Sequence, residues 1–235
     1  MSYQGPNPEV IRNMFKKVAP AYDRANTVLS AGIHHLWRRK LVKMANVQPG
    51  QLILDCATGT GDLAIEFKKA VGPQGKVIGT DFCAEMMTTA PSKASAQGLQ
   101  IDYQVADVMS LPFADNSFDR VSISFGIRNV QDPLRALQEM ARVTKPGGQV
   151  LILEFGQMTT PVIKDLYGFY SERLLPVVGG WVSGEKEAYQ YLQKSSAKFP
   201  SGPEFQDWMK QIGVFSSTAF TPVSLGIAYI YQGLK

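Results

Sequence analysis

Residues 52–81 read LILDCATGTGDLAIEFKKAVGPQGKVIGTD and predict a strand, a glycine-rich turn, a helix and a second strand. The apolar run 52–54 indicates a buried strand, and Gly59 and Gly61 lie in the turn that follows it. The second strand ends on Asp81, 20 residues after Gly61 (81 − 61). At this spacing a carboxylate can accept hydrogen bonds from a ribose diol. The stretch is therefore half of a nucleotide-binding α/β unit.

This stretch alone leaves its ligand open. Residues 59–64, GTGDLA, fit the G-x-G-x-x-G/A pattern of a nicotinamide or flavin dinucleotide site. S-adenosylmethionine fits equally well, because it also carries a ribose diol, and its carboxylate can replace the pyrophosphate at the helix N-terminus. A glycine turn with a purely structural role is the third alternative.

The composition indicates a folded globular protein. Of the 235 residues, 45% are hydrophobic and 19% are charged, and the net charge is +4. We expect one domain, 1–235, with an N-terminal helical segment at 8–48 and a helical insert at 156–203. The mild positive charge does not indicate nucleic acid, but it is compatible with contact to an anionic membrane surface. No apolar run reaches membrane-span length, and Cys56 and Cys83 form no metal-ligand pattern, so we expect reduced thiols and no metal centre.

The remaining pattern alternates strands and helices, which favours a mostly parallel sheet. We expect strands at 101–107, 119–125 and 149–155, a tight turn at 146–148, and helices at 84–98 and 133–143, the first of these kinked or shortened by Pro91. A last helix, 203–212, precedes strands at 214–221 and 225–232. Two consecutive strands after a helix predict an antiparallel hairpin at the sheet edge, which favours a methyltransferase over a dinucleotide enzyme.

The two additions to the sheet each allow two interpretations. The aromatic-rich insert 156–203 is either a lid over the cofactor end of the sheet or a cap on the sheet edge. In the N-terminal segment, a helix from Pro8 to Pro20 precedes a polar cluster that includes Tyr22 and His34. The second helix there has an expected core face of Leu36, Leu41, Val42 and Met44. Its basic face is either solvated or a lipid contact, and consists of Arg38, Arg39, Lys40 and Lys43.

Six segments together resemble the UbiE/MenG family of S-adenosylmethionine-dependent ubiquinone/menaquinone biosynthesis C-methyltransferases. They are YDRANTVLSAGIHHLW at 22–37, LDCATGTGD at 54–62, VIGTD at 77–81, LPF at 111–113, SFGIRNV at 124–130 and RVTKPGG at 142–148. The last is common to many methyltransferases, whereas 22–37 and 124–130 are specific. The resemblance departs at Ala57, where methyltransferase loops often carry glycine, and at Ala31, where relatives often carry a larger residue.

The resemblance implies a class I methyltransferase fold with S-adenosylmethionine as cofactor. By motif position it assigns the cofactor to Thr60 in the Gly59–Gly61 loop, Asp81 at the ribose, Asp107 and Val108 near adenine, and Ser124 at the end of the fourth strand. The implied substrate is a prenylated quinol. Residues 139–142 and 198–200 favour demethylmenaquinol, and the ubiquinone precursor stays open as an additional substrate.

Ring-carbon methylation needs a quinolate, so the enzyme must stabilise or create one. We expect Arg128 to stabilise the charge, Asn129 to fix its geometry and His34 to accept the proton. The long tail of the substrate implies a cytoplasmic protein at the inner face of the membrane. A homodimer is left open. The alternatives are a dinucleotide-dependent oxidoreductase and a methyltransferase of another small molecule.

Overall fold

The computed structural model describes residues 5–157 and 185–235. Its sheet has seven strands in the order β3-β2-β1-β4-β5-β7-β6. The strands are β1 (Leu52–Cys56), β2 (Lys76–Asp81), β3 (Asp102–Val105), β4 (Phe118–Ser124), β5 (Thr144–Phe155), β6 (Ser217–Val223) and β7 (Ala228–Leu234). The first five are parallel, and β7 runs antiparallel to both β5 and β6. The expected parallel sheet with an antiparallel C-terminal edge is confirmed.

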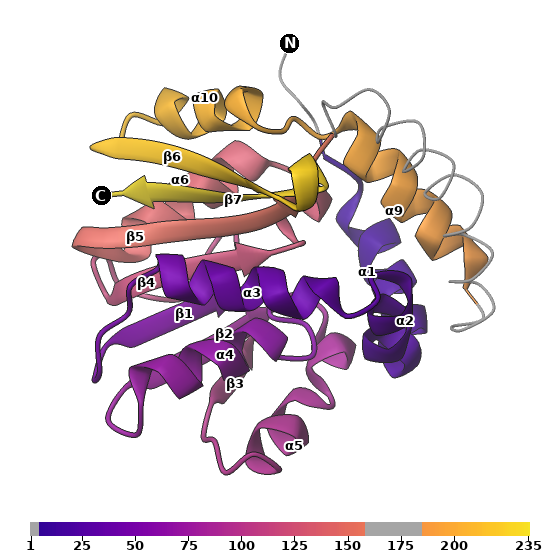
Figure 1. Cartoon of the computed structure of the whole chain (residues 1–235), viewed down its shortest axis with the longest axis horizontal. Helices are drawn as coiled ribbons and strands as arrows, with labels where there is room; N and C mark the ends of the chain where they lie inside the picture. The colour runs from indigo at the N-terminus through magenta and orange to yellow at the C-terminus, as the bar shows by residue number, and fades with distance from the viewer. Residues whose placement is uncertain (1–4, 158–184) are drawn as a thin grey trace.

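Helices cover both faces of the sheet (Figure 1). They are α1 (Pro8–Val18), α2 (Tyr22–Leu29), α3 (Ile33–Met44), α4 (Asp62–Val71), α5 (Ala90–Ser95), α6 (Pro133–Val143), α9 (Lys186–Lys198) and α10 (Pro203–Gln211). Successive residues of a strand point to opposite faces. Ile53 accordingly packs in the apolar cluster under α3 and α4, while Leu54 packs in the cluster under α6 and α10. The sheet is thus buried on both sides, as a parallel sheet requires.

Three helices stand beyond the carboxyl ends of the parallel strands. Figure 1 shows α1, α2 and α9 side by side there, and α1 contacts α9. Ligands of open α/β sheets bind at this edge. Residues 158–184, most of the insert expected at 156–203, lie outside the described residues. The part that is described, α9, is helical as expected.

Three local elements differ in extent from the expectation. The helix expected at 84–98 is shortened, as Pro91 predicted, to a short turn, Ala84–Met87, and α5, because Pro91 occupies the first turn of α5. Proline is tolerated there, since the first-turn N–H has no helical partner. The third strand is shorter than 101–107. The turn expected at 146–148 is part of β5, and backbone groups of Gly147 and Gly148 pair with Lys235.

The second N-terminal helix is also oriented differently from the prediction. Arg38, expected on the basic face, is buried, and Leu36, expected in the core, is exposed. Arg39, Lys40 and Lys43 are exposed as expected. None of the helices in the described parts of the chain is long and apolar enough to cross a membrane.

Candidate active site

The glycine-rich loop leaves β1 through three left-handed residues. Ala57 has φ 48°, Gly59 φ 54° and Gly61 φ 82°. A Cβ on Gly61 would lie 2.6 Å from the Tyr103 hydroxyl oxygen, so this position needs glycine for space as well as conformation. Ala57 adopts a conformation that costs an L-residue about 1–2 kcal/mol. The departure noted at Ala57 therefore falls where the backbone itself favours glycine.

Asp81 fastens this loop to the end of β2. Its carboxylate accepts the N–H of Gly59 at 2.9 Å and the N–H of Cys83 at 2.9 Å, one on each oxygen. The side chain is 6% exposed, and burial raises the pKa of Asp81 to about 6. Each oxygen keeps acceptor capacity for a further donor, as two ribose hydroxyls require.

A small cavity opens above Asp81. Three other predicted cofactor residues line it with Asp81 and Gly59: Asp107, Val108 and Ser124. Thr60 and Gly61 line neither of the cavities described here. The Thr60 hydroxyl donates instead to the Asp23 carboxylate at 2.5 Å. No sequence motif indicates this contact between the glycine loop and α2, because its partners lie 37 residues apart.

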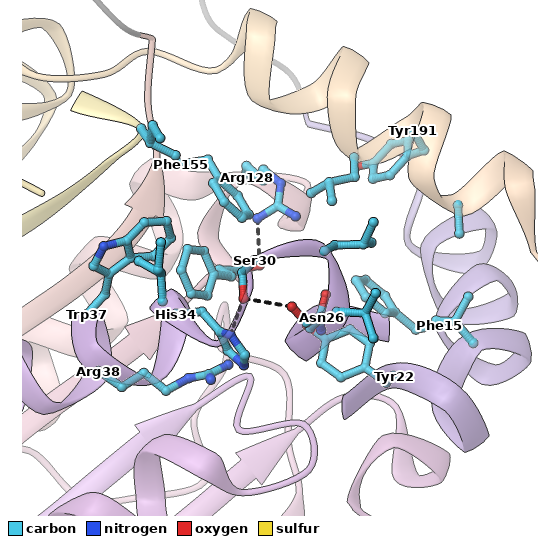
Figure 2. Close-up of a pocket in the computed structure, with 18 of the residues that line it drawn as sticks. Phe15, Tyr22, Asn26, Ser30, His34, Trp37, Arg38, Arg128, Phe155 and Tyr191 are labelled. Carbon is cyan, nitrogen blue, oxygen red and sulfur yellow. Dashed lines mark hydrogen bonds between the residues drawn. The ribbon is translucent and has the colours of Figure 1, made fainter. Parts of the chain in front are cut away.

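A second cavity, of about 500 Å³, lies between α1, α2, α3, α9 and the ends of β4 and β5. Its walls are mainly apolar, and Figure 2 shows the polar side chains Tyr22, Asn26, His34, Arg38 and Arg128 among them. Both cavities are lined by Phe15, Tyr22 and Phe125, so they meet at these three residues. The two cavities are therefore neighbours.

The Phe125 carbonyl organises the predicted catalytic pair. Phe125 has φ 56°, and its carbonyl accepts Arg128 Nη1 at 2.7 Å and Asn129 Nδ2 at 3.3 Å. Arg128 lines the larger cavity and Asn129 the smaller one. The two side chains thus donate to the same carbonyl oxygen, and Asn129 does not hold Arg128 through a direct hydrogen bond. A left-handed non-glycine residue stores strain of about 1–3 kcal/mol, often at functional sites.

Arg128 forms a buried ion pair with Glu154 of β5. Nη1 lies 2.6 Å from the Glu154 carboxylate, and the two side chains are 5% and 1% exposed. The guanidinium carbon lies 5.3 Å from the centre of the Phe155 ring. Arg128 Nε is buried and has no hydrogen-bond partner among the described residues. Glu154 is a site residue that was not predicted, although it is the single charged residue in the strand QVLILEF.

His34 of α3 is buried and also lines the larger cavity. Its Nδ1 lies 2.5 Å from the Ser30 hydroxyl oxygen. Burial, and then the positive charge of Arg38, lowers the pKa of His34 to about 3. The imidazole is therefore neutral at physiological pH. As a neutral ring it can accept a hydrogen bond, but it is a weak base.

An ion-pair network joins α2, α3, α4 and α5 beside His34. Asp62 pairs with Arg38 at 3.0 Å and with Lys93, and Lys93 also reaches Asp23 at 2.5 Å. Ligating atoms of His34, His35 and Asp62 lie within 4.8 Å of one another. The two cations already paired with Asp62 oppose the binding of a metal ion there.

A model of the ubiE/COQ5 methyltransferase family matches residues 4–235. The chain belongs to this family. It is 62% identical over 233 residues to the ubiquinone/menaquinone biosynthesis C-methyltransferase UbiE of Bdellovibrio bacteriovorus, covering 99% of each chain. It is 40% identical to the demethylmenaquinone methyltransferase of Staphylococcus aureus, covering 97% of this chain and 94% of the relative. The family decides against the dinucleotide-dependent oxidoreductase.

Solved structures agree on the fold. A methyltransferase of Thermotoga maritima that depends on S-adenosylmethionine gives a TM-score of 0.66 at 20% identity, covering 95% of this chain and 98% of that one. Another, from Aquifex aeolicus, gives 0.59 at 20% identity, covering 84% and 88%. The predicted class I methyltransferase fold is confirmed.

Proposed function

We propose that this protein uses S-adenosylmethionine to methylate a ring carbon of a prenylated quinol. The observation that carries the proposal is the meeting of the two cavities at Phe15, Tyr22 and Phe125. One cavity holds an acidic acceptor suited to a ribose, and the other is apolar with buried cations at its wall. Methyl transfer needs this arrangement, because the two reactants must touch in a defined orientation.

The smaller cavity suits the cofactor. Asp81 offers two partly used carboxylate oxygens to the ribose, and Asp107 and Val108 lie where the adenine is expected. Ser124 lies at the end of β4 beside them. When bound, S-adenosylmethionine supplies an electrophilic methyl group on its sulfonium. Asp81 and the loop at Gly59 bind and orient it, with Thr60 held by Asp23.

The larger cavity suits the ring of a quinol and the start of its tail. The neighbouring hydroxyl must lose its proton before a ring carbon becomes a strong nucleophile, and the negative charge needs stabilisation. Arg128 carries a positive charge at the cavity wall, fixed by Glu154 and by the Phe125 carbonyl. Arginine stays protonated, so its role is to hold the oxyanion. His34 lines the same cavity, accepts the hydrogen bond of the ring hydroxyl and takes its proton as the quinolate forms, because a neighbouring negative charge favours the protonated ring.

The described part of the insert forms one wall of the larger cavity. Ala188, Tyr191 and Leu192 of α9 line it, and the Tyr191 hydroxyl donates to Asn129 Oδ1 at 3.0 Å. This supports the lid interpretation of 156–203. It also keeps water away from a reactive quinolate.

The rim of the larger cavity suits a membrane surface on the cytoplasmic side. Val28 and Ile33 line the cavity and are also exposed, and Leu36 and Leu225 are exposed as well. Arg39, Lys40 and Lys43 of α3 add exposed positive charge. Exposed aliphatic side chains with basic neighbours favour an anionic bilayer. Sedimentation with liposomes, with and without anionic lipid, tests this, and no binding to either would count against it.

The experiment for the reaction uses labelled S-adenosylmethionine with reduced demethylmenaquinol and the ubiquinone precursor, each offered separately. Label on the naphthoquinol alone defines a menaquinone enzyme, and label on both defines a dual enzyme. If the cofactor binds and neither quinol is labelled, the quinol proposal is wrong and another small molecule is the substrate.

A further inference from the structure

Ser30 lies in the turn between α2 and α3, and its hydroxyl contacts one group of each helix (Figure 2). Its oxygen lies 2.7 Å from the backbone carbonyl of Asn26 and 2.5 Å from Nδ1 of His34. The first separation is that of a hydrogen bond and the second is shorter than an ordinary N···O hydrogen bond, so a hydrogen must lie in each contact.

Counting hydrogens decides the direction of both bonds. The Asn26 carbonyl carries no hydrogen, so the single hydroxyl hydrogen of Ser30 lies in the first contact. The hydrogen in the second contact must then come from His34 Nδ1. In the reverse arrangement, the Ser30 and Asn26 oxygens would face each other at 2.7 Å with no hydrogen between them. The chain of bonds is therefore carbonyl, hydroxyl, imidazole.

A neutral imidazole carries one N–H, so a hydrogen on Nδ1 leaves Nε2 as an acceptor. Burial, and then the charges of Arg38, His35 and Lys93, favour the neutral form of His34, whereas the charge of Asp62 opposes them. No described residue forms a hydrogen bond with Nε2, and the ring lines the larger cavity. The acceptor nitrogen therefore keeps its lone pair unused by the described residues, in a ring that lines the cavity.

Helix capping does not account for the Ser30 hydroxyl. The backbone N–H of Ser30 already donates to the same Asn26 carbonyl at 2.9 Å, which satisfies the end of α2. The hydroxyl adds a second hydrogen bond to this carbonyl, which the helix end does not need, and its oxygen is then oriented as an acceptor toward His34.

We propose that Ser30 is a positioning residue that fixes the Nδ1–H tautomer of His34, so that Nε2 accepts the hydrogen bond of the quinol hydroxyl. The proposal rests on the proposed function for the identity of that hydroxyl. Ser30 touches neither reactant in this role and acts through His34.

The tautomer is measured by NMR on the full chain labelled with ¹⁵N-histidine. The protein has two histidines, so the spectrum is simple, and His35→Gln assigns it. We expect a proton on Nδ1 and a bare Nε2 in the wild type, and a mixture of tautomers in Ser30→Ala. A wild-type proton on Nε2, or a Ser30→Ala spectrum unchanged from the wild type, would overturn the proposal. This result does not depend on which substrate the enzyme uses.

Kinetics with the quinol measures the consequence. We expect Ser30→Ala to lower kcat by about 10- to 100-fold, as loss of a group that orients an imidazole does. KM for the quinol and the affinity for the cofactor should stay within about twofold. Ser30→Thr keeps the hydroxyl and should restore most of kcat, and Thr27→Ala removes an exposed hydroxyl of the same helix as the control.

A double variant separates positioning from general damage to the fold. In a His34→Ala background, Ser30→Ala should cause no further loss of kcat, because its effect passes through His34. Losses that multiply, or a Ser30→Ala enzyme with wild-type kcat, would overturn the proposal. If the wild-type chain methylates no quinol, the proposed function fails, and the NMR experiment still decides the role of Ser30.

Discussion

Asp81 should make cofactor binding dependent on pH in a range where few other groups titrate. Its pKa is raised to about 6 by burial, while donors to the carboxylate favour the charged form. Ribose hydroxyls are such donors, so the bound state lowers this pKa again. Binding then releases a proton whenever the free protein holds Asp81 protonated. Affinity is therefore nearly complete at pH 7 and weakens as pH falls through 6.

The size of the effect follows from the pKa. With a value of about 6, roughly one molecule in eleven is ionised at pH 5, so affinity should be about tenfold lower at pH 5 than at pH 7. Asp81→Ala removes an acceptor for two charge-assisted bonds of about 1.5–3 kcal/mol each, which corresponds to a loss of about 10²- to 10⁴-fold at pH 7. Asp81→Asn should weaken binding and abolish the slope between pH 5 and 7.

Calorimetric titration with S-adenosylmethionine from pH 5 to 8 measures these affinities. Asp55→Asn is the matched control, because burial raises the pKa of Asp55 to about 6 as well, yet it bonds to Thr58 and Ser122 and lines neither cavity. The reasoning is refuted if wild-type affinity is flat over this range, or if Asp81→Asn keeps the slope.

Three further predictions concern the two cavities. Arg128→Ala should lower turnover far more than cofactor affinity, and it should cost about 3–5 kcal/mol of unfolding free energy, because Glu154 is left buried and unpaired. Replacing both as Arg128→Met with Glu154→Leu should recover stability in urea unfolding but not activity; recovered turnover would show that the charge is dispensable. Gly61→Ala should destabilise the fold more than Gly147→Ala, since both have positive φ but only the first would meet neighbouring atoms; equal unfolding midpoints would contradict this. Tyr191→Phe removes the hydroxyl that ties α9 to the β4 loop and should raise KM for the quinol several-fold with cofactor affinity unchanged, and an unchanged KM would argue against the lid.

The sheet was predictable because its signals are local. The apolar run at 52–54, the glycine turn and the acid at Asp81 each sit in a short segment with one favoured conformation. The final strand pair identified the antiparallel edge for the same reason. The shortening at Pro91 was predicted but its form was not, because the missing N–H permits either a kink or a helix start, and only the neighbouring packing selects between them.

The site was less predictable because its partners come from distant segments. Thr60 meets Asp23, 37 residues away, only after α2 folds across the carboxyl edge of the sheet. Arg38 lies within a basic run on α3, and only the orientation of that helix shows that it faces the cavity. A charge run in sequence does not say which of its members is buried.

Glu154 is the exception, since its partner could have been inferred. An ionised carboxylate within a fully apolar strand cannot be buried alone without a large cost, so QVLILEF required a cation close to its end. β4 and β5 are adjacent parallel strands, with Ser124 opposite Leu153, and their carboxyl ends therefore meet. Arg128 follows β4 by four residues (128 − 124) and is the first cation beyond that strand. The acid that fixes the arginine was thus readable from strand order and charge alone, before any side chain was placed.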